Sequence, residues 1–225
     1  MKNIIFSKKY ILPSMVAYWK MENNVLDSKG SNHGTATAIT YSVGKVGQAA
    51  VFNGSNSLIH CQNASFDFFA GAKYSFVVAL KLNALPTSGN IYHPIMIQDG
   101  INTDPFDKGF RVFSNGSVGF FAFDGAAKTA LSAPGVIGIN TWYTLIGVFN
   151  GSSLDLYVND SLVATVACSG SFNHTNPRIV LGHIHPGSSI ALNGLIDEVT
   201  VFNNSLSTAE RSDIFFKINN GQHLI

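Results

Sequence analysis

The sequence predicts an all-β protein, built as an antiparallel β-sandwich with one short helix near its C-terminal end. Short apolar runs recur along the chain, and Gly, Asn, Ser and Asp residues separate them. The 225 residues include 21 Gly and 17 Phe, which suits strands and turns better than helices. Hydrophobic residues make up 46% of the chain, enough for a sizeable core, and the length suits one sandwich domain.

The predicted strands follow one another from the first motif to the end of the sandwich. Side chains alternate clearly in Tyr74–Leu82, whereas Trp142–Phe149 is apolar on both faces, as expected for a central strand covered on both sides. Asn115-Gly116 stands between two aromatic runs and predicts a tight hairpin turn. The predicted strands are Val16–Met21, Val46–Asn53, Ser57–His60, Tyr74–Leu82, Ile91–Gln98, Gly109–Ser114, Ser117–Phe123, Trp142–Asn150, Ser153–Asn159, Ser161–Ala167, Arg178–Leu181 and Gly194–Phe202.

One helix is signalled after the last strand. Ser207 and Glu210 have the spacing of a capping box, in which each side chain satisfies a backbone amide of the other residue. Ile214, Phe215 and Ile218 then supply an apolar stripe, and Gly221 is suited to end the helix.

The chain divides into an N-terminal arm, residues 1–15, and one domain, residues 16–225. The arm is rich in apolar residues, so we expect it to dock onto a partner. Lys8 and Lys9 interrupt its apolar run, so no signal peptide is predicted. We therefore expect a cytoplasmically synthesised protein, with secretion as the alternative. No stretch is long enough to span a membrane.

Charge and cysteine usage exclude some functions. Charged residues make up 12% of the chain and the net charge is +1, so the sequence has no electrostatic footprint for nucleic acid. The two cysteines, Cys61 and Cys168, are far apart in sequence. We expect two buried free thiols, and the alternative is a disulfide.

Seven motifs, taken in chain order, resemble the laminin-G-like family of the concanavalin A-like lectin/glucanase superfamily. The chain departs from the family pattern at Tyr143, where His is frequent, and at Asn159-Asp160, which replaces Asp-Gly. The resemblance implies a jelly-roll sandwich of two antiparallel sheets, one of them concave, with the first and last strands close together. It also implies a binding protein. The motifs are Tyr18–Glu22, Asp27–Gly34, Gly44–Ser55, Trp142–Phe149, Leu154–Ala164, Arg178–Gly182 and Gly194–Phe202.

The same resemblance implies a structural calcium ion held by Glu22, Asp27 and Asp197. Alternation in Leu195–Phe202 places Asp197 on one face with Leu195, Val199 and Val201, which predicts an inward-pointing carboxylate. A buried carboxylate needs a cation or several hydrogen-bond donors. The alternative is therefore that these carboxylates accept backbone amides and cap turns.

Three further groups are candidate ligand sites. Arg111, Phe113, Phe121 and Phe123 occupy alternate positions of two neighbouring strands. On the concave sheet they would stack against sugar rings, and on the other face they would be core.

Asp99, Asp104 and Asp107 fall in one loop, which is either a ligand or cation loop at the rim or a solvated hairpin. His183 and His185 lie on one side of an extended segment, as the start of a zinc site or as part of a polar loop at the mouth of the sandwich.

The carboxylate inventory argues against glycoside hydrolysis, which needs two carboxylates across the scissile bond. Glu22, Glu198 and Glu210 are the only Glu residues, and none falls in the superfamily's E-x-D-x-x-E pattern. Asp197 and Glu198 are adjacent, so in a regular strand they would point to opposite faces. We therefore expect a non-catalytic module that binds a glycan or a cell-surface polysaccharide. The alternative is a structural phage virion protein that contacts other virion proteins through residues 1–15.

Overall fold

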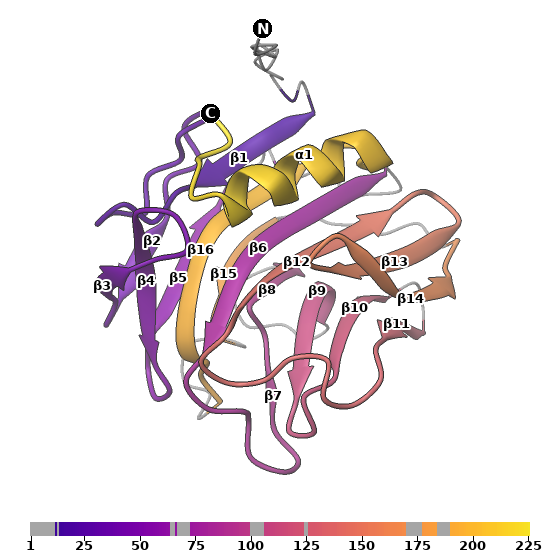
Figure 1. The fold of residues 1–225 in the computed structure, drawn as a ribbon, viewed down its shortest axis with the longest axis horizontal. Coiled ribbons are helices and arrows are strands. Elements are labelled where there is room, and N and C mark those ends of the chain that lie inside the picture. Colours follow the sequence, from indigo (N-terminus) through magenta and orange to yellow (C-terminus); the bar gives the residue numbers. More distant parts are fainter. Residues whose placement is uncertain are drawn as a thin grey trace, which may run out of the picture.

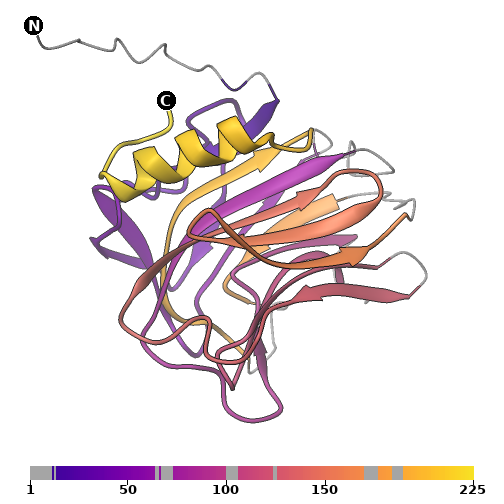
Figure 2. The same cartoon turned by 45° about the vertical axis from the view of Figure 1, so that its right-hand side comes forward.

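The computed structural model describes residues 12, 14–63, 66, 73–99, 106–123, 126–169, 177–183 and 190–225. It has two eight-stranded sheets packed face to face, in which all described strand pairs are antiparallel, and one helix (Figures 1 and 2). The predicted all-β sandwich is confirmed.

Sheet A contains the strands from both ends of the chain. β1 pairs with β16 beside the main path of the sheet. In spatial order, its strands are β14 (Ser161–Ala167), β13 (Ser153–Val158), β12 (Trp142–Phe149), β6 (Tyr74–Leu82), β16 (Asn193–Phe202), β4 (Gln48–Asn53) and β3 (Thr40–Val43), with β1 (Met15–Trp19) on β16.

Sheet B contains the strands from the middle of the chain. Its short strand β7 pairs with β9 beside the main path. In spatial order, its strands are β11 (Ala127–Leu131), β10 (Val118–Phe123), β9 (Phe106–Phe113), β8 (Ile95–Asp99), β15 (Pro177–Leu181), β5 (Leu58–Gln62) and β2 (Thr35–Thr37), with β7 (Ile91–Tyr92) on β9.

Aromatic rings from both sheets fill the core between them. Tyr74 and Phe76 of β6 meet Phe120 of β10 at ring-centroid distances of 6.2 and 6.0 Å, in edge-to-face geometry. Gly147 leaves room for the Phe120 ring, because a Cβ on Gly147 would lie 2.4 Å from it. The alternation in Tyr74–Leu82 therefore predicted the core face correctly. The even-numbered residues point into the core between the sheets, whereas Val77 and Ala79 point to the outer face of sheet A.

Three short strands, β2, β3 and β11, are absent from the sequence prediction. β2 is exposed along its whole length and β3 along most of it, so neither shows the apolar alternation that marks a half-buried strand. The predicted strand Ile91–Gln98 is two strands, β7 and β8, with Pro94 between them. A proline cannot donate to a ladder, which explains the break.

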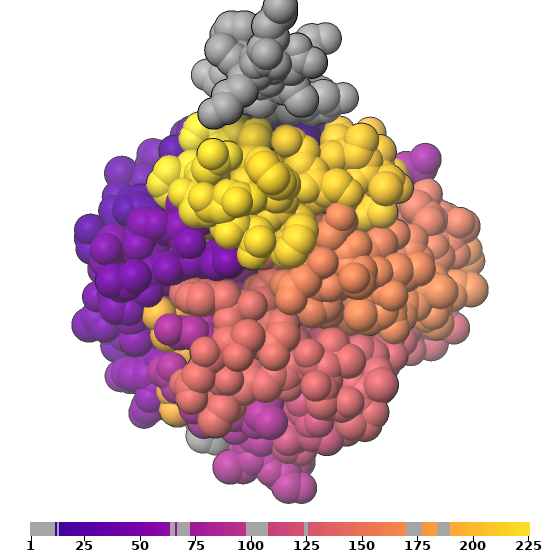
Figure 3. Space-filling view, viewed as in Figure 1, coloured from indigo at the N-terminus to yellow at the C-terminus, as the bar shows by residue number. Residues whose placement is uncertain are grey.

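Helix α1 (Thr208–Asn219) lies on the outer face of sheet A, over β6 and β16 (Figures 1 and 2). Its capping box is present as predicted: Glu210 N donates to Ser207 Oγ at 3.4 Å, and Ser207 N donates to Glu210 Oε2 at 2.8 Å. Ile214 and Ile218 are fully buried against this face. The helix and the residues after it form the yellow surface in Figure 3, next to the indigo N-terminal strands.

The helix explains the two apolar faces of β12. Leu145 and Phe149 belong to the core between the sheets. Ile146 and Val148 belong to a second apolar cluster, which lies between the outer face of sheet A and α1. The predicted double-sided burial of this strand is confirmed. No helix in the described part is both long and apolar enough to cross a membrane.

A β-bulge in β16 overturns the predicted alternation around Asp197. Asp197 pairs with Ala79 and Thr200 with Val77, so three steps along β16 match two along β6. The extra residue is Glu198, at φ 51°. Asp197 and Glu198 both point to the outer face of sheet A, whereas Val199 and Val201 point into the core between the sheets. The predictions that Asp197 shares a face with Val199, and that Asp197 and Glu198 diverge, are wrong.

Candidate functional site

The two ends of the chain meet at a junction in sheet A. Tyr18 and Trp19 of β1 pair with Thr200 and Val199 of β16, as the resemblance implied for the first and last strands. Asp27, in the loop after β1, accepts hydrogen bonds from the backbone amides of Tyr18, Lys29 and Asn32 at 2.9–3.0 Å. This carboxylate therefore closes the front loop onto β1.

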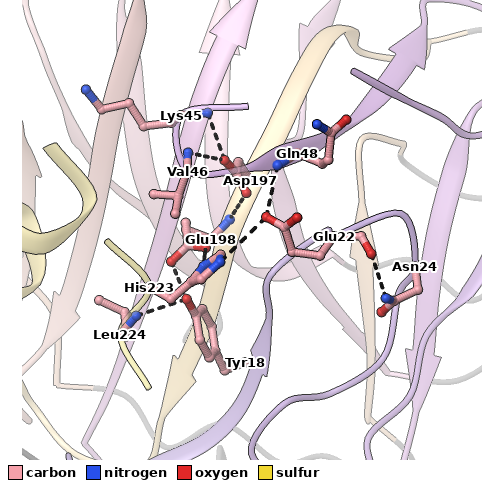
Figure 4. A network of polar contacts seen from close by, with 10 residues as sticks. All are labelled: Tyr18, Glu22, Asn24, Lys45, Val46, Gln48, Asp197, Glu198, His223 and Leu224. Carbon is pink, nitrogen blue, oxygen red and sulfur yellow. Dashed lines mark hydrogen bonds and ion pairs between the residues drawn. The ribbon is translucent and has the colours of Figure 1, made fainter. Parts of the chain in front are cut away.

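A second part of the junction is the turn between β3 and β4. Asp197 Oδ2 accepts from Lys45 N and Val46 N at 2.9 Å each, and Glu22 Oε1 accepts from Gln48 N at 2.9 Å (Figure 4). The glycines of this turn leave space for the carboxylates. A Cβ on Gly44 would lie 2.6 Å from Asp197 Oδ2, and a Cβ on Gly47, at φ +54°, would lie 2.0 Å from Glu22 Oε1.

These contacts do not fit a calcium ion shared by Glu22, Asp27 and Asp197. Calcium takes six to eight oxygen ligands, but here amide N–H groups already point at the carboxylate oxygens. No group of three His, Cys, Asp or Glu side chains in the described part is placed to hold a metal ion. The geometry instead matches the alternative, in which the carboxylates accept backbone amides. Calcium binding by the protein stays a prediction.

Glu198 lies at the centre of a buried network in this junction (Figure 4). Its side chain is fully buried, accepts a hydrogen bond from the Tyr18 hydroxyl, and contacts His223 Nδ1 at 2.8 Å. Leu224 N donates to the Tyr18 hydroxyl at 3.1 Å, which fixes the C-terminal residues to β1. Burial raises the pKa of Glu198 to about 8 and that of Asp197 also to about 8. The carboxylates of Asp197 and Glu198 are therefore both engaged in contacts that hold the chain ends together.

The outer face of sheet B is the second candidate region, because the described helix covers sheet A instead. Arg111, Phe113, Phe121 and Phe123 all lie on this face: Phe110, Val112, Phe120 and Ala122, which alternate with them, are in the core. Gly109 lies opposite Phe121 and Gly119 lies opposite Arg111, so no side chain stands at either of these cross-strand positions.

Arg111, Phe121 and His93 form a compact cluster on this face. The guanidinium carbon of Arg111 lies 3.8 Å from the centroid of the Phe121 ring, and the His93 ring meets Phe121 edge-on at 5.8 Å. Burial, and secondarily the charge of Arg111, lowers the pKa of His93 to about 3, so this imidazole is neutral at physiological pH. The positive charge of the cluster therefore belongs to Arg111.

The predicted stacking platform is partly wrong. Phe121 is 1% exposed, because Arg111 and His93 cover it, so its ring cannot meet a sugar directly. Phe113 is half-buried, and Phe123 is 37% exposed. Leu131 of β11 lies in the same cross-strand row as Arg111 and is 51% exposed. The sequence analysis missed Leu131 and His93, although the alternation of Thr129 and Leu131 with Ala130 was a usable signal for the former.

The other predicted ligand residues are only partly described. Asp104 and His185 lie outside the described residues. Asp99 is the last residue of β8 and Asp107 the second residue of β9, so their backbones lie on neighbouring strands. His183 is buried and bridges to Ala191 at the end of the sandwich. Next to it is a small pocket lined by Gly54, Thr87, Asn90, Tyr92, Ile190 and Ala191.

Taken together, the fold and its open sheet face define a concanavalin A-like jelly-roll protein. Residues 37–210 match the Laminin_G_3 model, described as the concanavalin A-like lectin/glucanases superfamily. The chain belongs to this family. No curated protein matches the chain in sequence.

Several solved structures share the fold at low sequence identity. Domain 4 of AbnA, a GH43 extracellular arabinanase from Geobacillus stearothermophilus, solved with arabinotriose, is 21% identical over 89% of this chain and 98% of its own, with a TM-score of 0.71. The binding domain of Paraclostridial Mosquitocidal Protein 1 is 15% identical over 90% of this chain, with a TM-score of 0.74. Trypanosoma rangeli sialidase, in complex with sialic acid, is 14% identical over 93% of this chain, with a TM-score of 0.72. The matched parts are 52% and 34% of the latter two chains, so this chain spans about half of one and a third of the other.

Proposed function

We propose that this protein is a non-catalytic glycan-binding module and that the outer face of sheet B is its binding surface. The observation that carries the proposal is the juxtaposition of an arginine stacked on Phe121 with the exposed side chains of Phe123 and Leu131. Aromatic and aliphatic side chains pack against the C–H faces of sugar rings, and a few polar groups orient the ligand. The arabinotriose in the AbnA domain 4 structure supports the same class of ligand for this fold.

We propose that the protein is not a glycoside hydrolase because its adjacent carboxylates in β16 are buried. Asp197 and Glu198 both lie on the outer side of sheet A, but each is fully buried, and neither can reach a glycosidic bond. Glu22 is engaged with Gln48 N and lies 3.6 Å from His223 Nε2. Glu210 caps α1.

A glycan array probed with the full chain tests this function. We expect retention on a defined set of glycans. Phe123→Ala removes an exposed ring from the proposed surface and should weaken retention at least fivefold. Phe216→Ala is the matched control, because Phe216 is 61% exposed on α1, on the other side of the molecule, and should leave retention unchanged. Retention on no glycan, or equal effects of the two variants, would refute the proposal.

A second proposal concerns display on a virion. The apolar arm at residues 1–15 supports docking on other virion proteins. Residues 1–11 and 13 lie outside the described residues, while Leu12 and Met15 pack in the cluster under α1. Deletion of residues 1–11 should therefore keep the domain folded and abolish incorporation into an assembled particle. Unchanged incorporation would count against the docking role.

A further inference from the structure

Arg111 lies on the outer face of sheet B, next to Phe121. Its guanidinium lies on Phe121, and its Nε is buried without a hydrogen-bond partner. It forms no ion pair with the residues that the structure describes. A buried Nε without a partner also occurs in Arg211, so this feature alone does not mark a ligand site. Arg111 differs in that no hydrogen bond or ion pair holds its guanidinium among the residues that the structure describes.

Arg211 shows what an arginine with a structural role looks like in the same protein. Its guanidinium also lies on an aromatic ring, 3.9 Å from the centroid of Tyr157. However, it donates to Leu206 O and to Thr208 Oγ1, at 3.2 Å each, and so fastens the start of α1. Arg111 makes the same ring contact without such hydrogen bonds.

Two glycines occupy the cross-strand positions beside Arg111 and Phe121. Gly109 lies opposite Phe121, at φ +147°, and a Cβ there would come within 2.2 Å of Ile95 O. Gly119 lies opposite Arg111, and a Cβ there would lie 2.6 Å from Thr129 Cγ2. The cross-strand positions beside the stack therefore carry no side chain. An arginine already ordered on a ring loses little conformational entropy when it binds a ligand.

The chemistry of the ligand follows from these contacts. A guanidinium presents a planar fork of donors that matches the two oxygens of a carboxylate or a sulfate. Phe123 lies two residues beyond Phe121 in β10, and Leu131 lies opposite Gly119, two residues before Phe121. Both side chains are exposed and suit the apolar faces of sugar rings. His93 is neutral and does not compete for the anion.

We propose that the bound glycan is acidic, with a carboxylate or sulfate group paired to Arg111 and neighbouring sugar rings packed on Phe123 and on Leu131. This inference rests on the proposed glycan-binding function and names the class of glycan.

Titration calorimetry with the full chain tests the inference. The probes are an oligohexuronate, its methyl ester as the uncharged counterpart, and a sulfated oligosaccharide of the same length. We expect the wild-type protein to bind one of the two acidic probes at least tenfold more tightly than the ester. Arg111→Gln should remove this preference, and Arg111→Lys, which keeps the charge but loses the fork, should keep part of it. The preferred acidic probe tells a carboxylate from a sulfate.

Lys81→Gln is the matched control, because Lys81 is also a cation over an aromatic ring, 5.4 Å from the centroid of Trp142 in sheet A. It should leave the preference unchanged, and a thermal melt should show that each variant is folded. Equal affinity for ester and acid, or a preference that survives in Arg111→Gln, would overturn the acidic-glycan inference while leaving glycan binding in place. Binding of none of the three probes, together with an empty glycan array, would overturn both.

Discussion

At the scale of single residues, the glycines of the β3–β4 turn explain how motifs from the two ends of the sequence come together. Gly44 and Gly47 stand where the carboxylates of Asp197 and Glu22 come closest to the backbone. The carboxylates in turn accept the amides of Lys45, Val46 and Gln48. The end motifs therefore describe one hydrogen-bonded junction.

Gly47→Ala should destabilise the protein through two effects. A left-handed backbone with a Cβ costs about 1 kcal/mol, and the clash with Glu22 Oε1 adds about 1–3 kcal/mol, as overpacking does. Gly89→Ala is the control, since Gly89 also has a positive φ, +85°, but nothing lies within 4 Å of its Cβ. Urea unfolding should show a clearly larger loss for Gly47→Ala. Equal losses for the two variants would contradict the account of this turn.

Glu198 gives the protein a predictable pH dependence of stability. Burial raises its pKa to about 8 in the folded protein, from 4.5 when exposed. The folded state therefore binds this proton more tightly than the unfolded state. The stabilisation is complete below about pH 4.5 and is lost as the pH rises through about 8.

The free energy of unfolding, measured by urea titration from pH 5 to pH 9, should fall with rising pH by on the order of a few kcal/mol, since each pKa unit is worth about 1.4 kcal/mol. Glu198→Gln should reduce this fall. Part of it should remain, because the pKa of Asp197 is also raised to about 8. A wild-type protein with flat stability over this range, or a variant with an unchanged slope, would show that Glu198 is not the titrating group.

At the scale of elements, sequence pattern predicts best where a strand or helix has a clear periodicity. Tyr74–Leu82 and the capping box at Ser207 appear as predicted, because local chemistry specifies them. The bulge at Glu198 was not predictable in this way. It adds one residue to β16 and reverses the faces of everything after it, and only the pairing with β6 reveals it.

The candidate site shows the same limit. Alternation placed Arg111, Phe113, Phe121 and Phe123 on one face, which the structure bears out. It did not show that Arg111 and His93 would cover Phe121, because those contacts cross from β9 to β10 and from the residue after β7. Exposure depends on such neighbours and not on the period of the strand.

The capping box offers a test of α1. Ser207→Ala should cost about 1 kcal/mol of stability, the usual value for a lost N-cap. Glu210→Ala should cost less, and the double variant should cost less than the sum of the two, because the residues bond each other. Ser55→Ala, in an exposed turn, is the control and should be near neutral. Strict additivity in urea unfolding would argue against a reciprocal box.

At the scale of the whole molecule, α1 and the C-terminal residues cover part of the outer face of sheet A. The described part of the chain places no helix over the outer face of sheet B (Figure 2). The first and last strands pair, and Leu224 N holds the C-terminal end on Tyr18. The uncovered outer face of sheet B is the face that we propose as the glycan-binding surface.

Chelation tests whether the junction needs a metal ion. Because amide groups already satisfy Asp27 and Asp197, removal of calcium with EDTA should leave the melting temperature unchanged relative to a sample in calcium chloride. An ion that binds only the folded state must raise its stability. A melting temperature that falls with EDTA and recovers with calcium would therefore contradict the ion-free junction and support the calcium prediction.

The most direct test of the central claim is the glycan array with the wild-type chain and an Arg111→Gln, Phe123→Ala double variant. The account predicts that the wild-type chain is retained on a defined class of glycans and that the double variant, still folded, is not. Retention of both proteins to the same extent, or of neither, would contradict the assignment of the outer face of sheet B as a glycan-binding surface.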